Sequence, residues 1–167
     1  VWLVHDLNPD GFNHCPCDDD LSPCTCSAPN WVCCFNISLN EVGQIFKKNF
    51  ERKNSSRIQS FELFIRPNDS VIPTDLLSKI QVSIKIDLHC LSIGTQRLQI
   101  DPGAFRSSSN FTRTITISDC DSKDLNLAFL RDFHRLRKVK LTRIANVDQI
   151  NWPTLPVLPK LDELYVT

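Results

Sequence analysis

Short apolar-x-apolar triplets recur along the chain, and this recurrence is the strongest constraint on its fold. The triplets lie at residues 61–63, 84–86, 115–117, 139–141 and 164–166, so successive starts are 23, 31, 24 and 25 residues apart. Each triplet is typical of a short strand that turns two apolar side chains to one side. Strands at such a period predict a protein of stacked repeats, in which each repeat covers the apolar edge of the next.

The segments between the triplets have a different period. After residues 115–117, apolar side chains follow at near-helical spacing: Phe129, Leu130, Phe133 and Leu136. After residues 84–86 the chain runs through Leu98 to a turn at residues 101–105. The expected unit is therefore a strand, a turn and a short helix or irregular return, which predicts an α/β fold.

One conventional helix is expected before the first triplet. Val42, Ile45, Phe46 and Phe50 fall on one helical face, and residues 38–41 have the Ser-x-x-Glu arrangement of a capping box. We expect this helix to pack beside the cysteine-rich segment that precedes it.

The chain has eight cysteines, and six of them lie within twenty consecutive positions: Cys15, Cys17, Cys24, Cys26, Cys33 and Cys34. A segment this polar cannot order itself by apolar burial, so it requires cross-links. Disulfides or a zinc ion would serve, although structural zinc sites more often show Cys-x2-4-Cys pairs. Cys90 and Cys120, one repeat apart, are interpreted either as a disulfide between neighbouring turns or as two buried thiols.

Four acceptor triplets for N-glycosylation begin at Asn36, Asn54, Asn68 and Asn110. Together with the cysteine block they favour a secreted, extracellular protein with disulfides and N-linked glycans. The chain contains no methionine, so we expect that a secretory signal has been removed or that the sequence is part of a longer protein.

Composition excludes several other classes. Nineteen basic and nineteen acidic residues cancel, so no overall field favours nucleic acid. The four glycines, at positions 11, 43, 94 and 103, form neither the dinucleotide-binding nor the phosphate-loop pattern, and no apolar run is long enough to span a membrane. The one local excess of positive charge lies between Arg131 and Arg143. We interpret it either as the solvent-exposed side of a return segment or as a binding site for an acidic glycan or protein.

The cysteine block resembles a known motif. Cys15-Pro16, Cys24-Thr25-Cys26, Val32 and Cys34 resemble the amino-terminal cap of extracellular leucine-rich-repeat proteins. More narrowly, residues 23–26, 101–105 and 117–120 are similar to arthropod secreted proteins related to the non-catalytic subunit of decapod shrimp luciferase.

The resemblance implies a right-handed leucine-rich-repeat solenoid, with a short parallel sheet on its concave side and short helices and irregular returns on its convex side. It also implies partner binding rather than chemistry, and two disulfides in the cap, to which Cys17 and Cys33 would be additional. The expected division is an extension at 1–14, a cysteine-rich cap at 15–36, a capping helix and irregular turn at 37–57, and about five repeats at 58–167 without a carboxyl-terminal cysteine cap.

Residues between and after the apolar pairs would point out across the concave face. Two columns are expected there, the first being Glu62, Lys85, Thr116, Lys140 and Tyr165 and the second Phe64, Asp87, Ser118, Thr142 and Thr167. Neither column gathers the histidine, carboxylate and nucleophile of a hydrolase, so no catalytic, cofactor or metal residues are predicted. Phe64 and Tyr165 are the expected anchors for a protein partner.

The leading hypothesis is a secreted, glycosylated, non-catalytic leucine-rich-repeat module for protein–protein recognition or extracellular assembly. Two alternatives remain: an accessory subunit of a secreted enzyme complex, and an innate-immune-type recognition ectodomain that binds glycan or lipid. Because residues 161–166 end in an uncovered strand, we also expect that the natural chain continues or that this last repeat associates with another subunit.

Overall fold

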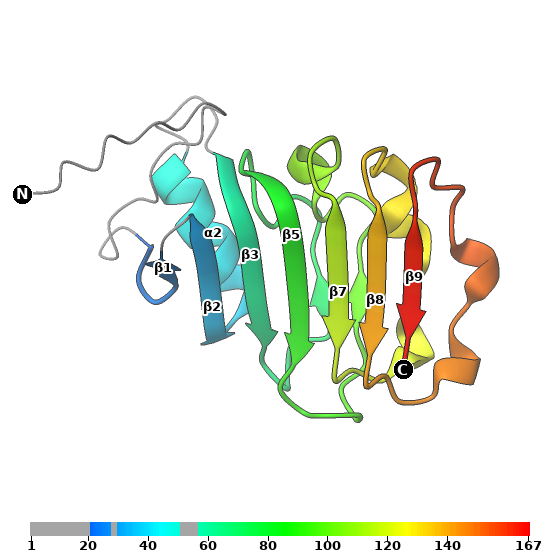
Figure 1. Cartoon of the computed structure of the whole chain (residues 1–167). Coiled ribbons are helices and arrows are strands. Elements are labelled where there is room, and N and C mark those ends of the chain that lie inside the picture. Colours follow the sequence, from blue (N-terminus) through cyan, green and yellow to red (C-terminus); the bar gives the residue numbers. More distant parts are fainter. Residues whose placement is uncertain (1–20, 28–29, 51–56) are drawn as a thin grey trace, which may run out of the picture.

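The computed structural model describes residues 21–27, 30–50 and 57–167. The protein is α/β, with a seven-stranded, mostly parallel sheet in the order β1-β2-β3-β5-β7-β8-β9 (Figure 1). From β2 onward, strands that follow one another in this order are parallel, and only β1 runs antiparallel to β2. Each return segment therefore brings the chain back to start a new strand beside the previous one.

The strands of the large sheet are β1 (Thr25–Ser27), β2 (Trp31–Ile37), β3 (Arg57–Ile65), β5 (Gln81–Cys90), β7 (Thr114–Ser118), β8 (Lys138–Thr142) and β9 (Glu163–Val166). A second, two-stranded parallel sheet pairs β4 (Val71–Ile72) with β6 (Gln99–Ile100). The helices are α2 (Leu39–Phe50) and the short 3-10 helices η1 (Arg106–Ser108), η2 (Ser122–Asp124), η3 (Leu127–Asp132), η4 (Val147–Gln149) and η5 (Trp152–Thr154).

Two rows of apolar side chains on one face of the large sheet form the centre of the core. Strand pairing aligns the first row as Val32, Phe61, Ile86, Ile115, Val139 and Leu164. It aligns the second row as Cys34, Leu63, Leu88, Ile117, Leu141 and Val166. All are buried except at β9, where Leu164 is exposed and Val166 is half-buried, since β9 has only β8 as a strand neighbour in the described chain.

The predicted strand positions are confirmed, but one triplet is shifted in register. Ile58 pairs with Val82 and Ser60 pairs with Lys85, so β5 carries one residue more than β3 between these two pairs. This β-bulge turns Ile84 outward, to 43% exposure, and makes Ile86 and Leu88 the inward pair. With Ile86 as the first inward residue, the spacing of the repeats is more even than the sequence pattern indicated.

The predicted helix is confirmed as α2. Its capping box is formed: Glu41 N donates to Ser38 Oγ at 3.2 Å, and Ser38 N donates to Glu41 Oε2 at 3.2 Å. The hydrogen bonds from Ser38 hold the pKa of the Glu41 carboxyl below its ordinary value. Val42 and Phe46 are buried, and the Phe46 ring meets Phe61 of β3 edge-on at 5.6 Å, so the helix covers the apolar face of β2 and β3.

Disulfides cross-link the chain at both predicted places. Cys24 pairs with Cys34, which joins the segment before β1 to β2, and Cys26 is also disulfide-bonded. Cys90 pairs with Cys120, so the disulfide interpretation of these two residues is confirmed. The expectation that Cys33 also forms a cap disulfide is wrong: it is a free thiol, because it points to the opposite face of β2 from Cys34. Cys15, Cys17 and Asn54, like the expected extension at 1–14, lie outside the described residues.

Neighbouring returns are also joined by hydrogen bonds. Leu76 N donates to Ala104 O at 3.1 Å, and Ser122 N donates to Ala145 O at 3.0 Å, one repeat further along. Within the described ranges, no helix is long and apolar enough to cross a membrane.

The Cys90–Cys120 disulfide should contribute strongly to stability, because it closes a loop across a sequence separation of 30. Loop-closure entropy predicts that the double variant Cys90→Ala/Cys120→Ala loses about 3 to 4 kcal/mol of unfolding free energy. Denaturant unfolding followed by circular dichroism measures this loss. Cys33→Ala, which removes a free thiol, is the matched control; an equal loss in both proteins would contradict the bond.

The β-bulge in β5 predicts opposite outcomes for two isoleucines two positions apart. Ile86→Ala removes a fully buried side chain and should cost about 2 to 5 kcal/mol. Ile84→Ala removes a side chain that faces solvent and should cost well under half as much. Thermal and denaturant melts of the two variants decide the register, and a larger cost at Ile84 would show that β5 pairs with β3 in a different register.

Candidate binding face

The face of the large sheet opposite the apolar rows is the candidate site. α2 and the returns lie on the other side of the sheet, and the described residues place no helix or strand across this face (Figure 1). We call it the open face. Its side chains form three rows that run across the strands, at the amino end, the middle and the carboxyl end.

The amino row consists of Trp31, Ser60, Lys85, Thr114, Lys138 and Glu163. The middle row consists of Cys33, Glu62, Asp87, Thr116, Lys140 and Tyr165. The carboxyl row consists of Phe35, Phe64, His89, Ser118 and Thr142. Thr167 continues it beyond β9, where its hydroxyl accepts a hydrogen bond from Arg143 N at 3.4 Å.

The ten predicted face residues therefore lie on or beside one face, but their alignment differs from the predicted columns. Lys85 is opposite Ser60 and Thr114 rather than Glu62, and Asp87 is opposite Glu62 rather than Phe64. The bulge in β5 causes both errors. The expected neighbour pair of Glu62 and Lys85 is absent; Lys85 instead pairs with Asp87 on its own strand, at 2.6 Å.

Sequence reasoning missed part of the face because β2 was assigned to a cysteine cap instead of the sheet. The alternation of Val32 and Cys34 with Trp31, Cys33 and Phe35 is the signal that could have shown this strand. Its outward side chains supply the most exposed aromatic of the face, since Phe35 is 60% exposed. His89 was missed for a different reason, the shift in β5.

Aromatic rings gather on the β2 side of the face. The rings of Phe35 and Phe64 are 5.1 Å apart at a tilt of 51°, and Phe64 stacks on His89 at 4.6 Å and 17°. Trp31, at the amino end of β2, is also exposed. Strands β2, β3 and β5 thus carry a group of neighbouring rings on the open face. We call Trp31, Phe35, Phe64 and His89 the aromatic ladder.

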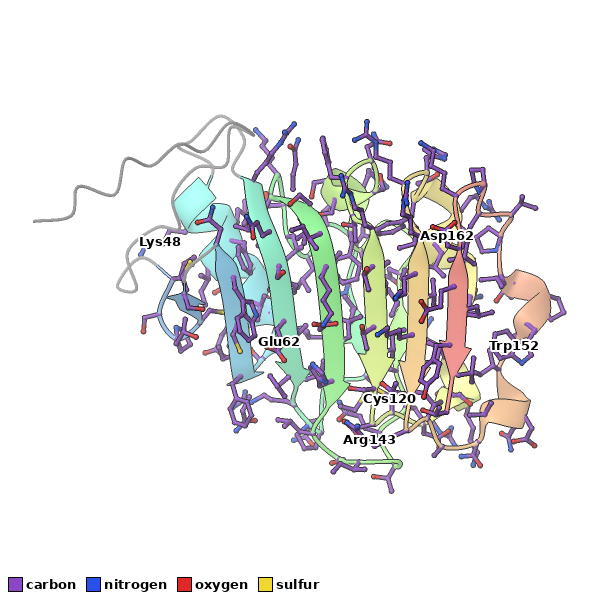
Figure 2. The ribbon with its side chains drawn as sticks, viewed as in Figure 1. Lys48, Glu62, Cys120, Arg143, Trp152 and Asp162 are labelled. Carbon is purple, nitrogen blue, oxygen red and sulfur yellow. A yellow bond between two sulfur atoms is a disulfide. The ribbon has the colours of Figure 1, made fainter. Side chains whose placement is uncertain are left out.

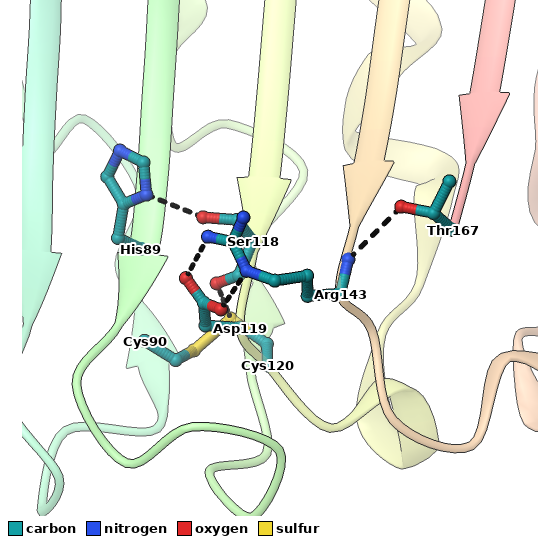
Figure 3. A network of polar contacts seen from close by, with 7 residues as sticks. All are labelled: His89, Cys90, Ser118, Asp119, Cys120, Arg143 and Thr167. Carbon is teal, nitrogen blue, oxygen red and sulfur yellow. Dashed lines mark hydrogen bonds and ion pairs between the residues drawn. A yellow bond between two sulfur atoms is a disulfide. The ribbon is translucent and has the colours of Figure 1, made fainter.

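A polar set lies next to this ladder and corrects the expectation that no histidine, carboxylate and nucleophile converge. His89 Nδ1 is 2.5 Å from Ser118 Oγ (Figure 3), and His89 Nε2 is 3.1 Å from Oε1 of Glu62, which is labelled in Figure 2. His89 Nε2 has no hydrogen-bond partner, so its contact with Glu62 Oε1 does not have the geometry of a hydrogen bond. Ser118 is only 2% exposed, so its hydroxyl cannot meet a substrate as a nucleophile must.

Buried polar atoms mark the middle of the face. Asp87 Oδ1 and Thr116 Oγ1 are buried without a hydrogen-bond partner among the described residues, although these two residues face each other on β5 and β7. On β2, in the same row, burial raises the pKa of the Cys33 thiol, and the neighbouring Glu62 carboxylate raises it further. The thiol therefore stays protonated near neutral pH and is a weak nucleophile.

Asp119 and Arg143 form a bidentate ion pair at the carboxyl edge of the sheet. Arg143 Nε donates to Asp119 Oδ1 at 2.7 Å, and Nη2 donates to Oδ2 at 2.8 Å (Figure 3). The hydrogen bond from Arg143 holds the pKa of the Asp119 carboxyl below its ordinary value, aided by the charges of Arg143 and His89. Asp119 directly follows β7 and Arg143 directly follows β8, and both have a left-handed backbone conformation. Asn36, within β2, has the same conformation.

The expected glycosylation sites within the described residues are all accessible. Asn36, Asn68 and Asn110 are exposed, so the structure leaves room for a glycan at each. Among the described residues, no three His, Cys, Asp or Glu side chains are arranged to hold a metal ion.

Comparison of the chain with protein-family models, with curated proteins and with solved structures gives no significant match. The assignment of the site therefore rests on its geometry.

The Asp119–Arg143 pair predicts a specific pH dependence. Because the pKa of Asp119 is lower in the folded chain than the value of about 3.9 expected in the unfolded chain, the pair stabilises the fold fully above pH 4. This contribution is lost as the pH falls through the folded-state pKa. Arg143→Gln should therefore lower the melting temperature at pH 7 and have little effect at pH 2. Thermal melts at several pH values between 2 and 7 measure this difference.

The matched control is Arg137→Gln, since Arg137 and Asp162 lie 3.7 Å apart and are both well exposed. It should shift the melting temperature little at any pH. A loss in Arg143→Gln that is the same at pH 2 and pH 7 would show that the Asp119 charge is not responsible.

Proposed function

We propose that the chain is an extracellular leucine-rich-repeat module whose open face binds another protein, without catalysing a reaction. Parallel strands in sequence order, two continuous apolar rows and hydrogen bonds between neighbouring returns support the solenoid assignment. In this proposal the open face is the concave surface of a right-handed solenoid, and β1 with the Cys24–Cys34 disulfide belongs to its cap.

The extracellular part of the proposal rests on cross-links and acceptor sites. The Cys24–Cys34 and Cys90–Cys120 disulfides are compatible with an oxidising compartment. Asn36, Asn68 and Asn110 stand in acceptor triplets and are exposed. Secretion and N-glycosylation together account for both features.

The aromatic ladder is the observation that carries the binding proposal. Aromatic rings contribute most per side chain at protein interfaces, and the exposed Trp31 and Phe35 stand on β2 beside the half-buried Phe64 of β3. Beside them, the unpartnered Asp87 Oδ1 and Thr116 Oγ1 provide acceptors that a partner's donors would satisfy after local side-chain movement. The burial of Ser118 supports recognition over hydrolysis.

A second candidate is association through β9, with a copy of this chain or with another subunit. Leu164 and Tyr165 are exposed on opposite faces of this strand, which pairs only with β8 in the described chain. In an accessory-subunit role, either β9 or the open face would hold the catalytic partner. Addition of a strand to β9 would extend the sheet by backbone hydrogen bonds.

The ladder predicts partner loss in a defined variant. Phe35→Ser/Phe64→Ser should weaken binding of the open-face partner about thirtyfold or more, because the loss of even one anchor worth about 2 kcal/mol has this effect. The secreted protein, attached to beads through an amino-terminal tag, is incubated with the extracellular fluid of its source tissue. Quantitative mass spectrometry then compares the captured proteins.

The matched control is Ile93→Ser/Val157→Ser, which removes two apolar side chains that are 72% and 93% exposed and lie outside the open face. It should retain every partner of the parent chain. A partner retained equally by all three proteins does not bind the aromatic ladder, and if every captured protein behaves so, the proposal is wrong.

A further inference from the structure

A pocket at the amino end of the sheet gathers three arginines from distant parts of the sequence. Arg57 begins β3, Arg113 directly precedes β7, and Arg135 lies in the return before β8. All three line one pocket with a volume of about 330 Å³, and the remaining lining residues are uncharged: Gln59, Ser83, Ile84 and Phe111. The described lining thus carries three positive charges and no carboxylate.

The three arginines differ from other basic side chains near this edge in having no ion pair. Within the described part of the chain, Arg57, Arg113 and Arg135 have no carboxylate within ion-pair distance. One strand further along, Arg137 lies 3.7 Å from Asp162, which is labelled in Figure 2, and Lys138 lies 2.6 Å from Glu163. The charges at the pocket are therefore not neutralised by the described protein.

The pocket is held in place by backbone and side-chain contacts. Arg113 N donates to Ile84 O at 3.1 Å, and Arg113 O accepts from Arg137 N at 2.9 Å, which fixes Arg113 between two strands. Arg57 Nε donates to Gln81 Oε1 at 2.8 Å, and its guanidinium lies 4.6 Å from the Phe111 ring centroid. This leaves the terminal nitrogens of Arg57 as donors for a ligand.

The β-bulge in β5 supplies the apolar wall. Ser83 and Ile84 stand opposite Gln59 at the register shift, and all three line the pocket. An outward isoleucine beside neutral hydrogen-bonding groups suits a ring that has one apolar face and polar edges. Bulges commonly redirect side chains at functional sites.

We infer that this pocket binds a saccharide unit that carries a sulfate or carboxylate group. Guanidinium groups match such oxyanions with paired donors, Gln59 and Ser83 suit sugar hydroxyls, and Ile84 suits the apolar face of the ring. The volume is at the lower end of the range of roughly 300 to 1,000 Å³ for small-molecule pockets, which fits a compact unit better than a protein surface. The assignment adds a second site beside the aromatic ladder.

Isothermal titration calorimetry of the secreted protein tests the inference, with dextran sulfate oligosaccharide as the probe. The parent chain should bind it, and Arg113→Gln and Arg135→Gln should each weaken binding about tenfold or more, since each removes a charged hydrogen-bond donor. Arg131→Gln is the matched control: Arg131 is exposed on η3, carries the same charge and does not line the pocket. Binding should persist in this control and in Phe35→Ser/Phe64→Ser.

Four results would overturn the inference. The first is that the parent chain does not bind the probe. The second is that Arg131→Gln weakens binding as much as the pocket variants do, which would indicate general charge attraction. The third is that unsulfated dextran of the same length binds equally well, which would show that the sulfate groups are irrelevant. The fourth is that inorganic sulfate or an aspartate-rich peptide binds more tightly than the oligosaccharide and that the same variants lose this binding. That result would assign the pocket to a free anion or to a protein. Melting temperatures matching the parent chain confirm that the variants are folded.

Discussion

Alignment of two apolar rows across parallel strands is the constraint on which the rest of the structure depends. A single strand of this protein offers only a pair of inward side chains, such as Ile115 and Ile117, which cannot form a core by itself. The parallel ladder places each pair against the next, so that burial is continuous from β2 to β8. The outward side chains are then fixed in rows as a consequence, and the aromatic ladder takes its geometry from these rows, whereas the arginine pocket lies beside the bulge in β5.

The core pattern could be predicted from the sequence because hydrophobic burial demands it at every repeat. Residues 115–117 and 139–141 were placed correctly, and so was the capped helix, whose Ser38 and Glu41 signals are local. The bulge in β5 could not be predicted in this way, since Ile84 and Ile86 are equally apolar and only pairing with β3 decides which of them is inside. A local pattern gives the strand, whereas the register depends on contacts between strands.

The same limit applies to the candidate sites. Because of the one-residue register shift in β5, the sequence pattern did not show that Glu62, His89 and Ser118, from three different strands, approach one another. The arginine pocket was similarly out of reach, because its three arginines are separated by long stretches of sequence and meet only when the amino ends of the strands are side by side. Residue types could be identified from the sequence, but their convergence required the strand order and the bulge together.

The Cys90–Cys120 disulfide determines how the sheet would respond to a pulling force. A force that pulls on the two ends passes through the sulfur–sulfur bond and bypasses the enclosed segment, which contains β7. A sequence separation of 30 corresponds to roughly 100 Å of extended chain that cannot lengthen while the bond is intact. Stretching would therefore peel off the flanking strands first, and the middle of the sheet would become extensible only after chemical reduction.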